Sequence, residues 1–583
     1  SNNGATLYFI WESTVSSFII NTLTRDKTIS SIKKTLDKNP NSQNYYKAAV
    51  FYRTKFKRNR FHKDYTDYVI TKNKLIHPKA KRSIQSLFSG KILSKYDGII
   101  KANGLYKVKL GELVYVKKYA TNLVANKQKG KKVAKKLYGL VFNLTKTEVG
   151  IMFFGSTKSI FVGQYIFRSG QRLKVPVGAA LLGRIVDSLG TPLDGLKNQT
   201  LGNLKSLTEK KGPGIITRGS VNQPLHTGIL VVDCLFPIGR GQRELIIGNK
   251  QTGKTSIALT SILSQNIDTE LKKSKTYLYC VYVAIGQRKS SIAKIYNIFK
   301  KTKALKYTTI VSATADDSAN LQFLAPYSGC TIAEYFRDRG KDALIIFDDL
   351  SKQAVCYRQA SLLLERVPTR GAYPGDVFYL HSKLLERSAK LSPSFFGGSL
   401  TALPVIETVG GDITAYIPTN VISITDGQIF VDEDLFLNNI KPGINIRLSV
   451  SRIGSKAQIL PIKKLASSFK NALVEYDEFK RFEVFDGVSA AIKQIIHRGK
   501  RLLEQVKQGA IQAVNIEAQL ILISLSTSGF FDKFSITETK NFKNDVCLAV
   551  KNHTSLVNIA NYKNLDINKW NEKLITSFSK GKN

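Results

Sequence analysis

The spacing of hydrophobic and polar residues divides the chain into four stretches. In the first, hydrophobic residues recur at helical spacing over residues 11–23, which predicts a short amphipathic helix. Such a helix packs on its own domain or docks on a partner, and the pattern leaves both open. Residues 25–86 show little periodicity and are interpreted as a basic insert. We therefore expect residues 1–87 to form an amphipathic helix followed by a basic extension.

The second stretch consists of short β-type runs between turn residues. Residues 113–116 and 149–154 are examples, and their spacing is typical of a small β-barrel, which we expect over residues 88–176. Lysines are concentrated at positions 127–136, between two of these runs. We interpret this segment as a solvated loop in preference to a nucleic-acid-binding patch.

The third and fourth stretches differ in their β content. From 177 to 460, continuous apolar runs alternate with helical stretches, which is typical of a parallel sheet covered on both faces. From 461 to 583, β-type runs become rare and the pattern predicts a helical bundle. The predicted fold class is therefore multidomain, with an N-terminal β-barrel, a central α/β domain and a C-terminal α-helical bundle.

Charge is the one unusual feature of the composition. The chain has 583 residues, of which 43% are hydrophobic and 22% charged, as in ordinary soluble proteins. Lys and Arg number 88 against 43 Asp and Glu, a formal net charge of +45. A polyanion, an acidic lipid surface, acidic protein neighbours and a solvated lysine-rich surface all fit this excess.

Cysteine and apolar content exclude several classes of protein. The five cysteines are widely spaced and form no CxxC pair, which argues against a disulfide framework or a zinc ribbon and predicts buried thiols in a reducing compartment. No HExxH pattern occurs among the six histidines. No apolar run reaches 18 residues, so a membrane-spanning helix is not expected.

The strongest chemical signal is an eight-residue motif between the predicted strand 244–247 and a helical run. It matches GxxxxGK[ST] in full and has the strand–loop–helix context that the pattern requires. Glycines let backbone N–H groups approach a phosphate chain, and the helix start adds positive potential. The motif consists of Gly248, Asn249, Lys250, Gln251, Thr252, Gly253, Lys254 and Thr255, and the helical run starts at Ser256.

Two side chains of the motif are expected to bind the charged groups of a magnesium nucleotide. Lys254 would reach the β- and γ-phosphates of ATP, or the β-phosphate of ADP, and the Thr255 hydroxyl would ligate Mg²⁺. A second, buried-type strand ends at Asp348, where an acid can hold Mg²⁺ through water. Asp349, the next residue, can instead cap a helix, and both interpretations can hold together. The sequence thus predicts a P-loop nucleotide site.

Hydrolysis needs a further group that orients and polarises the attacking water. In this topology it is expected at the end of the strand that follows the P-loop helix, where the chain has Gln287. Because an amide cannot act as a carboxylate base, we predict a nucleotide site that is weak or inactive in catalysis. The alternative is that a carboxylate elsewhere, such as Glu334, acts as the base.

Several longer strings resemble one family. They are residues 238–248, 251–255, 373–382, 399–408, 422–428 and 449–455. Over about residues 88–530 the chain is similar to the α subunits of F-type ATP synthases. The resemblance implies a three-domain subunit that alternates with catalytic β subunits in a three-plus-three ring around a central rotor stalk, driven by proton flow through a membrane sector to which it is peripheral.

The resemblance also implies a binding partner and a location in the cell. Residues 11–23 fall where the family docks its peripheral stalk, and no nucleic-acid partner is expected. The abundance of Lys and Asn adds an organellar expectation. We therefore predict a peripheral protein on the matrix side of the mitochondrial inner membrane, without a transmembrane segment.

Residue roles carried over from the family are more specific. β-type chains have a catalytic Glu at the position of Gln287, so this subunit's own site would be regulatory or structural. Arg452 would reach into the neighbouring β site as an arginine finger, an effect worth about 10³–10⁵ in rate. The alternative for Arg452 is an ion pair at the subunit interface. Family positions that contact nucleotide correspond to Lys250, Gln251, Lys441, Pro442 and Gln508.

Some positions depart from the family, and two other functions compete. Asn249 replaces the usual Asp, Arg447 a usual Gly, and Ala510 a second purine-contacting Gln. An RNA translocase of the transcription-terminator type would share the RecA-like core and suit the positive charge. It lacks support because no aromatic-rich platform precedes the core. A catalytic subunit of a related rotary or export ATPase is the other alternative, and Gln287 argues against it.

Overall fold

The amino-terminal hydrophobic stretch forms two antiparallel strands in the computed structural model of the chain. β1 (Gly4–Trp11) pairs with β2 (Thr14–Asn21), so that Gly4 lies opposite Asn21 and Trp11 opposite Thr14. The prediction of a helix over residues 11–23 is therefore wrong. The segment is rich in residues branched at Cβ, which lose side-chain freedom in a helix and suit an extended strand.

The structure describes residues 4–11, 14–21, 89–117, 136–195, 204–271, 278–484 and 489–552. These fall into two units, divided between Arg172 and Leu173. The interpretations of residues 25–86 as a basic insert and of 127–136 as a solvated loop rest on residues outside these ranges, apart from Lys136.

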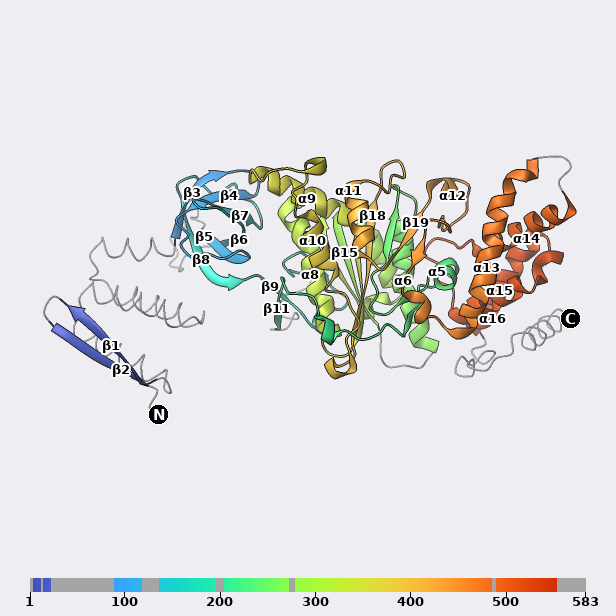
Figure 1. Cartoon of the computed structure of the whole chain (residues 1–583), viewed down its shortest axis with the longest axis horizontal. Coiled ribbons are helices and arrows are strands. Elements are labelled where there is room, and N and C mark those ends of the chain that lie inside the picture. Colours follow the sequence, from blue (N-terminus) through green and yellow to red (C-terminus); the bar gives the residue numbers. More distant parts are fainter. Residues whose placement is uncertain are drawn as a thin grey trace. The chain divides into compact units, whose positions relative to one another are not determined.

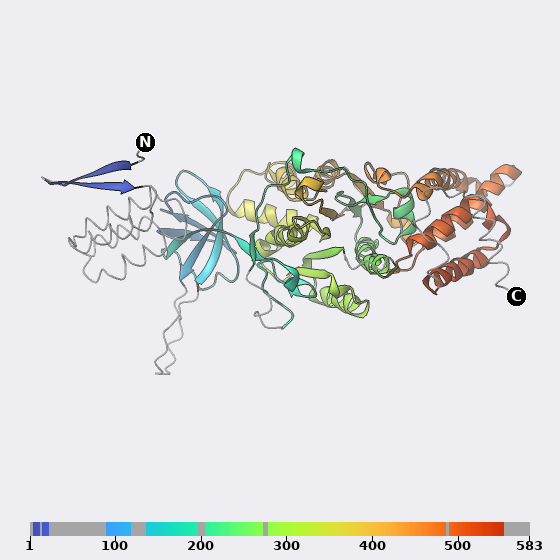
Figure 2. The ribbon, with the colours of Figure 1, turned by 90° about the horizontal axis from the view of Figure 1, so that it is seen from below.

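The first unit contains a closed six-stranded β-barrel (Figures 1 and 2). Its strands are β3 (Ser89–Lys95), β4 (Ile99–Asn103), β5 (Glu112–Lys117), β6 (Lys136–Leu144), β7 (Val149–Phe153) and β8 (Tyr165–Arg172), in the order β3-β4-β7-β6-β5-β8. Alternate residues such as Val114 and Val116 point into the barrel and are buried. Closure leaves no free sheet edge.

The second unit is built on an eight-stranded sheet. Its strands are β10 (Ile185–Val186), β14 (Leu245–Gly248), β15 (Tyr279–Gln287), β16 (Thr308–Thr314), β17 (Asp342–Asp348), β18 (Ser399–Glu407), β19 (Gly427–Val431) and β20 (Val450–Ser451). The order is β10-β16-β15-β17-β18-β14-β19-β20, parallel except between β19 and β20. The central strands are almost wholly buried, as their continuous apolar runs predict.

Helices cover both faces of this sheet (Figure 1). They are α6 (Lys254–Leu271), α7 (Lys289–Lys301), α8 (Ala319–Arg337), α9 (Leu350–Leu363), α10 (Val377–Leu385) and α11 (Tyr416–Ile424). Right-handed crossovers place α6 and α7 on one face and α8 and α9 on the other, because the chain crosses the sheet in opposite directions in the two pairs. Because the strands are parallel, their carboxyl ends all lie at the same edge of the sheet.

Shorter elements surround this sheet. β9 (Lys174–Pro176) pairs with β11 (Lys205–Leu207), and β12 (Pro224–Leu225) pairs with β13 (Ile238–Gly239), both antiparallel. Two short α-helices are α5 (Leu230–Leu235), which lies between β12 and β13 in the sequence, and α12 (Glu433–Leu437), which follows β19.

After α12, the described part of the chain forms four α-helices, orange to red in Figure 2. They are α13 (Leu460–Phe479), α14 (Ala490–Val506), α15 (Ile516–Thr527) and α16 (Ile536–Asn552). α15 is buried on every side; α13 and α16 pack against it, and α14 packs on α13 and α16. The predicted fold class of β-barrel, α/β domain and helical bundle is confirmed. Among the described helices, none combines the length and apolar character needed to cross a bilayer.

The cysteines carry free thiols rather than disulfides. Cys234, Cys280, Cys330 and Cys356 are buried, and Cys547 is half-buried. Burial raises the pKa of each thiol, because the low-dielectric interior disfavours the thiolate. The prediction of buried thiols is confirmed for the first four.

Candidate nucleotide-binding site

The phosphate loop connects β14 to α6. β14 ends at Gly248 and α6 begins at Lys254, which is the context that the sequence motif requires. A Cβ on Gly248 would lie 2.3 Å from the carbonyl oxygen of Val431, so no side chain fits there. Gly253 has a φ of 93°, in a region that other residues rarely adopt. Both glycines are therefore required by the path of the loop.

Lys254 folds back over the loop. Its Nζ donates to the carbonyl oxygen of Gly248 at 2.9 Å and to that of Asn249. Burial lowers the pKa of Lys254, against the raising effect of nearby carboxylates such as Glu407. The ammonium thus lies beside the loop, where it can exchange these carbonyls for phosphate oxygens.

Asn249 ties the loop to the segment that follows β18. Its Oδ1 accepts hydrogen bonds from the Thr408 hydroxyl and the Gly411 N–H, both at 2.7 Å. An amide oxygen accepts both bonds, so the local structure tolerates Asn where the family usually has Asp. Lys250 and Gln251 are exposed on the outer turn of the loop, and the buried Thr252 donates to the Asn249 carbonyl at 2.8 Å.

Thr255 and Asp348 are brought together from α6 and the end of β17. The Thr255 hydroxyl donates to Asp348 Oδ2 at 2.8 Å, although β18 separates β17 from β14 in the sheet. Because the hydroxyl proton points to the carboxylate, its lone pairs stay available to a cation. Hard oxygen donors of this kind fit Mg²⁺. Ser256 is half-buried in the same first turn of α6.

Asp349 has a different, structural role. It is the N-cap of α9 and accepts the Lys352 backbone N–H at 2.8 Å. Burial, with the charges of Glu407 and Asp348, raises the pKa of Asp349 to about 6 against the opposing charge of Lys352. The helix cap at Asp349 is therefore confirmed, and Mg²⁺ binding by Asp348 stays a prediction.

Gln287 lies at the end of β15, beside Asp348. Its Nε2 donates to the Tyr282 hydroxyl oxygen and to the Asp348 backbone carbonyl, both at 3.2 Å. Tyr282 in turn donates to Asp348 Oδ2 at 2.7 Å. Burial, with the charge of Asp348, raises the pKa of Tyr282 well above its ordinary value, so the phenol keeps its proton. Tyr282 was missed in the sequence because it looks like one more apolar strand residue.

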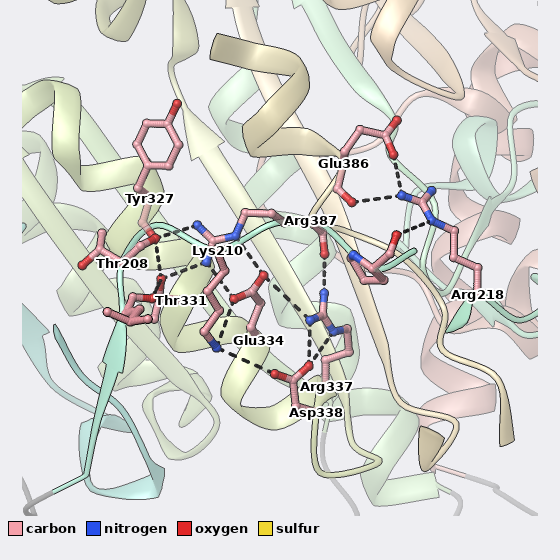
Figure 3. A network of polar contacts seen from close by, with 12 residues as sticks. Thr208, Lys210, Arg218, Tyr327, Thr331, Glu334, Arg337, Asp338, Glu386 and Arg387 are labelled. Carbon is pink, nitrogen blue, oxygen red and sulfur yellow. Dashed lines mark hydrogen bonds and ion pairs between the residues drawn. The ribbon is translucent and has the colours of Figure 1, made fainter. Parts of the chain in front are cut away.

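Glu334 is occupied elsewhere. Figure 3 shows it on α8, facing the guanidinium of Arg387. Its two carboxylate oxygens accept from Arg387 Nε at 2.8 Å and Nη2 at 2.7 Å, and the side chain is 1% exposed. Burial raises the pKa of Glu334, but the hydrogen bonds and charge of Arg387 outweigh it and hold that pKa below its ordinary value. A carboxylate so engaged cannot serve as the general base at the phosphate loop.

The residues carried over for the purine also meet. The Gln508 N–H donates to the Lys441 carbonyl at 2.6 Å, and the Gln508 side chain bonds the backbone of Gly228 and Leu230. Pro442 follows Lys441 directly, and the Lys441 ammonium lies 4.7 Å from the centre of the Phe436 ring. That ring adjoins the phosphate loop, 3.4 Å from where a Cβ on Gly253 would stand. Phe436 was missed, and its only signal was an aromatic residue five positions before Lys441.

Arg452 lies apart from this cluster, directly after β20. Its backbone N–H donates to the Asp426 carbonyl at 3.0 Å, and Asp426 is held by two hydrogen bonds from the Arg243 guanidinium, at 2.8 and 3.0 Å. The Arg452 side chain is exposed, and in the part of the chain that the structure describes its guanidinium forms no hydrogen bond or ion pair. The backbone is thus anchored and the side chain is exposed, while its charge still acts on the buried Glu244, where it opposes the rise in pKa that burial causes.

Comparison with known families agrees with this geometry. The family model described as "ATP synthase alpha/beta family, nucleotide-binding domain" matches residues 228–451. The model described as "ATP synthase alpha/beta chain, C terminal domain" matches residues 458–580. The first match contains the phosphate loop, Gln287 and Asp348, and the second contains Gln508. Since the two matches together cover more than half of the chain, and its barrel, sheet and helices have the matching architecture, the chain belongs to the ATP synthase alpha/beta family.

Proposed function

We propose that this chain is the non-catalytic, nucleotide-binding α subunit of a rotary ATP synthase, in which ATP synthesis from ADP and phosphate is coupled to proton transport. The observation that carries the proposal is the amide of Gln287 at the end of β15. A group that takes a proton from the attacking water is expected there, and an amide cannot take one. The site is therefore suited to hold a nucleotide rather than to cleave it.

Each residue of the site then has a role in binding ATP or ADP. The N–H groups of the loop and the Lys254 ammonium bind the phosphates, and the Thr255 hydroxyl with Asp348 holds Mg²⁺. When bound, Mg²⁺ neutralises charge on the β- and γ-phosphate oxygens. Lys441, Pro442 and Gln508, with the ring of Phe436, form the wall on which the purine rests.

Arg452 supplies the contribution of this subunit to catalysis. Its guanidinium would enter the active site of an adjacent β subunit and stabilise charge that develops on the transferred phosphoryl group. The exposed side chain on an anchored backbone supports this role, because a finger must reach outward from a fixed base.

The assembly follows from the same proposal. Three copies would alternate with three catalytic β subunits around the central rotor stalk, peripheral to the membrane sector on the matrix side of the mitochondrial inner membrane. Docking of the peripheral stalk on residues 11–23 stays a prediction, now with the hairpin of β1 and β2 in place of a helix. No role for nucleic acid is proposed.

Replacing Arg452 by Ala in the assembled complex tests the function. We expect ATP turnover to fall by about 10³-fold, because an arginine finger contributes at least that much, while nucleotide binding to this subunit stays unchanged. Steady-state hydrolysis and nucleotide retention by the purified complex measure the two effects.

Arg447→Ala is the matched control, because Arg447 is exposed and pairs on the surface with Asp477 and Glu478. It should leave turnover within about twofold of the parent, since surface ion pairs contribute little. Brisk hydrolysis by this chain alone, or normal turnover by the Arg452→Ala complex, would refute the proposal.

A further inference from the structure

A chain of hydrogen bonds ends on one oxygen of the Asp348 carboxylate. Tyr282, from the middle of β15, and Thr255, from α6, both donate to Oδ2, at 2.7 and 2.8 Å. Gln287 donates to the Tyr282 oxygen at 3.2 Å and, with its second amide proton, to the Asp348 carbonyl at 3.2 Å. Among the described residues no group donates to the other carboxylate oxygen, Oδ1. The carboxylate is therefore held by one oxygen, and the other remains free.

A bulge in β15 makes this chain possible. Residues five apart on a regular strand point to opposite faces, so Tyr282 and Gln287 would not meet. The pairing of β15 with β16 shifts register between Ile285 and Gln287, and the intervening Gly286 has a φ of 60°. The extra residue returns Gln287 to the side of Tyr282. A Cβ on Gly286 would also lie 2.8 Å from the side chains of Gln322 and Lys352, so both the φ angle and the space favour glycine at the bulge.

The direction of the bonds follows from the chemistry of the groups. An ionised carboxylate only accepts, so Tyr282 must donate to Asp348. Its oxygen is then free to accept, and the Gln287 amide supplies the proton. Tyr282 is fully buried, so water cannot replace either partner. A carboxylate at position 287 would have no proton to donate and would place negative charge against the Tyr282 oxygen and the Asp348 carbonyl.

We infer that Tyr282 and Gln287 are positioning residues, which fix the Asp348 carboxylate so that Oδ2 faces Thr255 and Oδ1 faces the water shell of nucleotide-bound Mg²⁺. The inference rests on the proposed function, because it takes the phosphate loop to hold a magnesium nucleotide. It gives the amide at position 287 a task of its own, beyond the absence of a base. Gln287→Glu should then weaken the metal site and create no hydrolytic activity.

The experiment measures ADP binding to the full chain by calorimetry, once with Mg²⁺ and once with EDTA. Tyr282→Phe keeps the ring and removes only the hydroxyl. We expect it to reduce the gain in ADP affinity that Mg²⁺ provides by about 10-fold, as is typical when a partner of a metal ligand is lost. Affinity in EDTA should stay at the parent value. Gln287→Leu, at a half-buried position, should shift the same quantity in the same direction.

Tyr307→Phe is the matched control. Tyr307 is equally buried, and its hydroxyl donates to the Ile262 carbonyl at 3.1 Å, away from Asp348. It should leave the Mg²⁺-dependent gain unchanged. The inference fails if Tyr282→Phe keeps the full gain, or if it loses affinity equally in EDTA. A parent chain that binds ADP without any gain from Mg²⁺ also refutes it but leaves the nucleotide site standing, whereas a parent chain that binds no ADP refutes the proposed function itself.

Discussion

Asp348 and Asp349 show how far single residues determine this site. They are adjacent in sequence, yet Asp348 faces Thr255 and Tyr282 while Asp349 caps α9. The sequence predicted an acid at the end of this strand, because parallel strands end at the ligand edge of the sheet. It could not assign the hydrogen-bond partners, since Tyr282 comes from another strand and looks like an ordinary apolar residue.

His381, on α10, is a residue whose charge the fold suppresses. It is fully buried, and within the described residues neither ring nitrogen has a hydrogen-bond partner. Burial lowers the pKa of His381 from 6.5 to about 4. Its stabilising contribution is therefore present above pH 6.5 and is lost as the pH falls through 4, because the unfolded chain takes up the proton first.

Replacing His381 by Leu should remove this pH dependence. The difference in unfolding free energy between variant and parent should move in favour of the variant by on the order of 3 kcal/mol between about pH 7 and about pH 4. Urea unfolding of both proteins at the two pH values measures it. A difference that does not change with pH would show that His381 is not the titrating group.

At the scale of elements, a buried ion pair joins α8 to the end of α10. Arg387 is 0% exposed, and besides Glu334 it bonds the Thr208 carbonyl and the Thr331 hydroxyl, as Figure 3 shows. Arg337, one turn beyond Glu334, pairs with Asp338 and donates to the Arg387 carbonyl. Glu334 and Arg387 are far apart in sequence, so no local pattern predicted their pairing.

Arg387→Met should be strongly destabilising, because it removes the bidentate partner of the buried Glu334 carboxylate and leaves only the longer contacts of Lys210, at 3.6 Å, and Arg337, at 3.7 Å. We expect a loss of about 3–5 kcal/mol in unfolding free energy, measured by urea denaturation. The double variant with Glu334→Leu should recover most of this loss, since both charges are then gone. Arg339→Met is the control. It removes a cation just after the end of α8, the helix that carries Glu334, and should have little effect. A single variant as stable as the control would contradict this account.

At the scale of the whole molecule, the sequence predicted the three kinds of fold in order but not every element. Continuous apolar strands up to residue 460 and the scarcity of β-type runs after it left little ambiguity. Over residues 11–23 the short apolar run is compatible with the period of a helix and with that of a strand. Pairing with β1 stabilises the strand. Lys441, Pro442 and Gln508 were predicted for the purine wall, but Phe436 was missed because its position beside them depends on how α12 and the loop before α15 meet.

Deleting residues 1–23 tests the role proposed for the hairpin. A two-stranded hairpin is marginally stable by itself, so we expect β1 and β2 to be held by another subunit. The truncated chain should still form the ring, and the peripheral stalk should dissociate more readily. Native mass spectrometry of the purified complex reports both, and a truncated complex that retains its stalk normally would rule the idea out.

The buried cysteines have a practical consequence for labelling the protein. Four sulfhydryls are shielded from reagents and also resist ionisation. A maleimide dye should therefore not react with them in the folded protein. A cysteine engineered at an exposed surface position could therefore carry a fluorophore or a bead tether without first stripping out those four native ones.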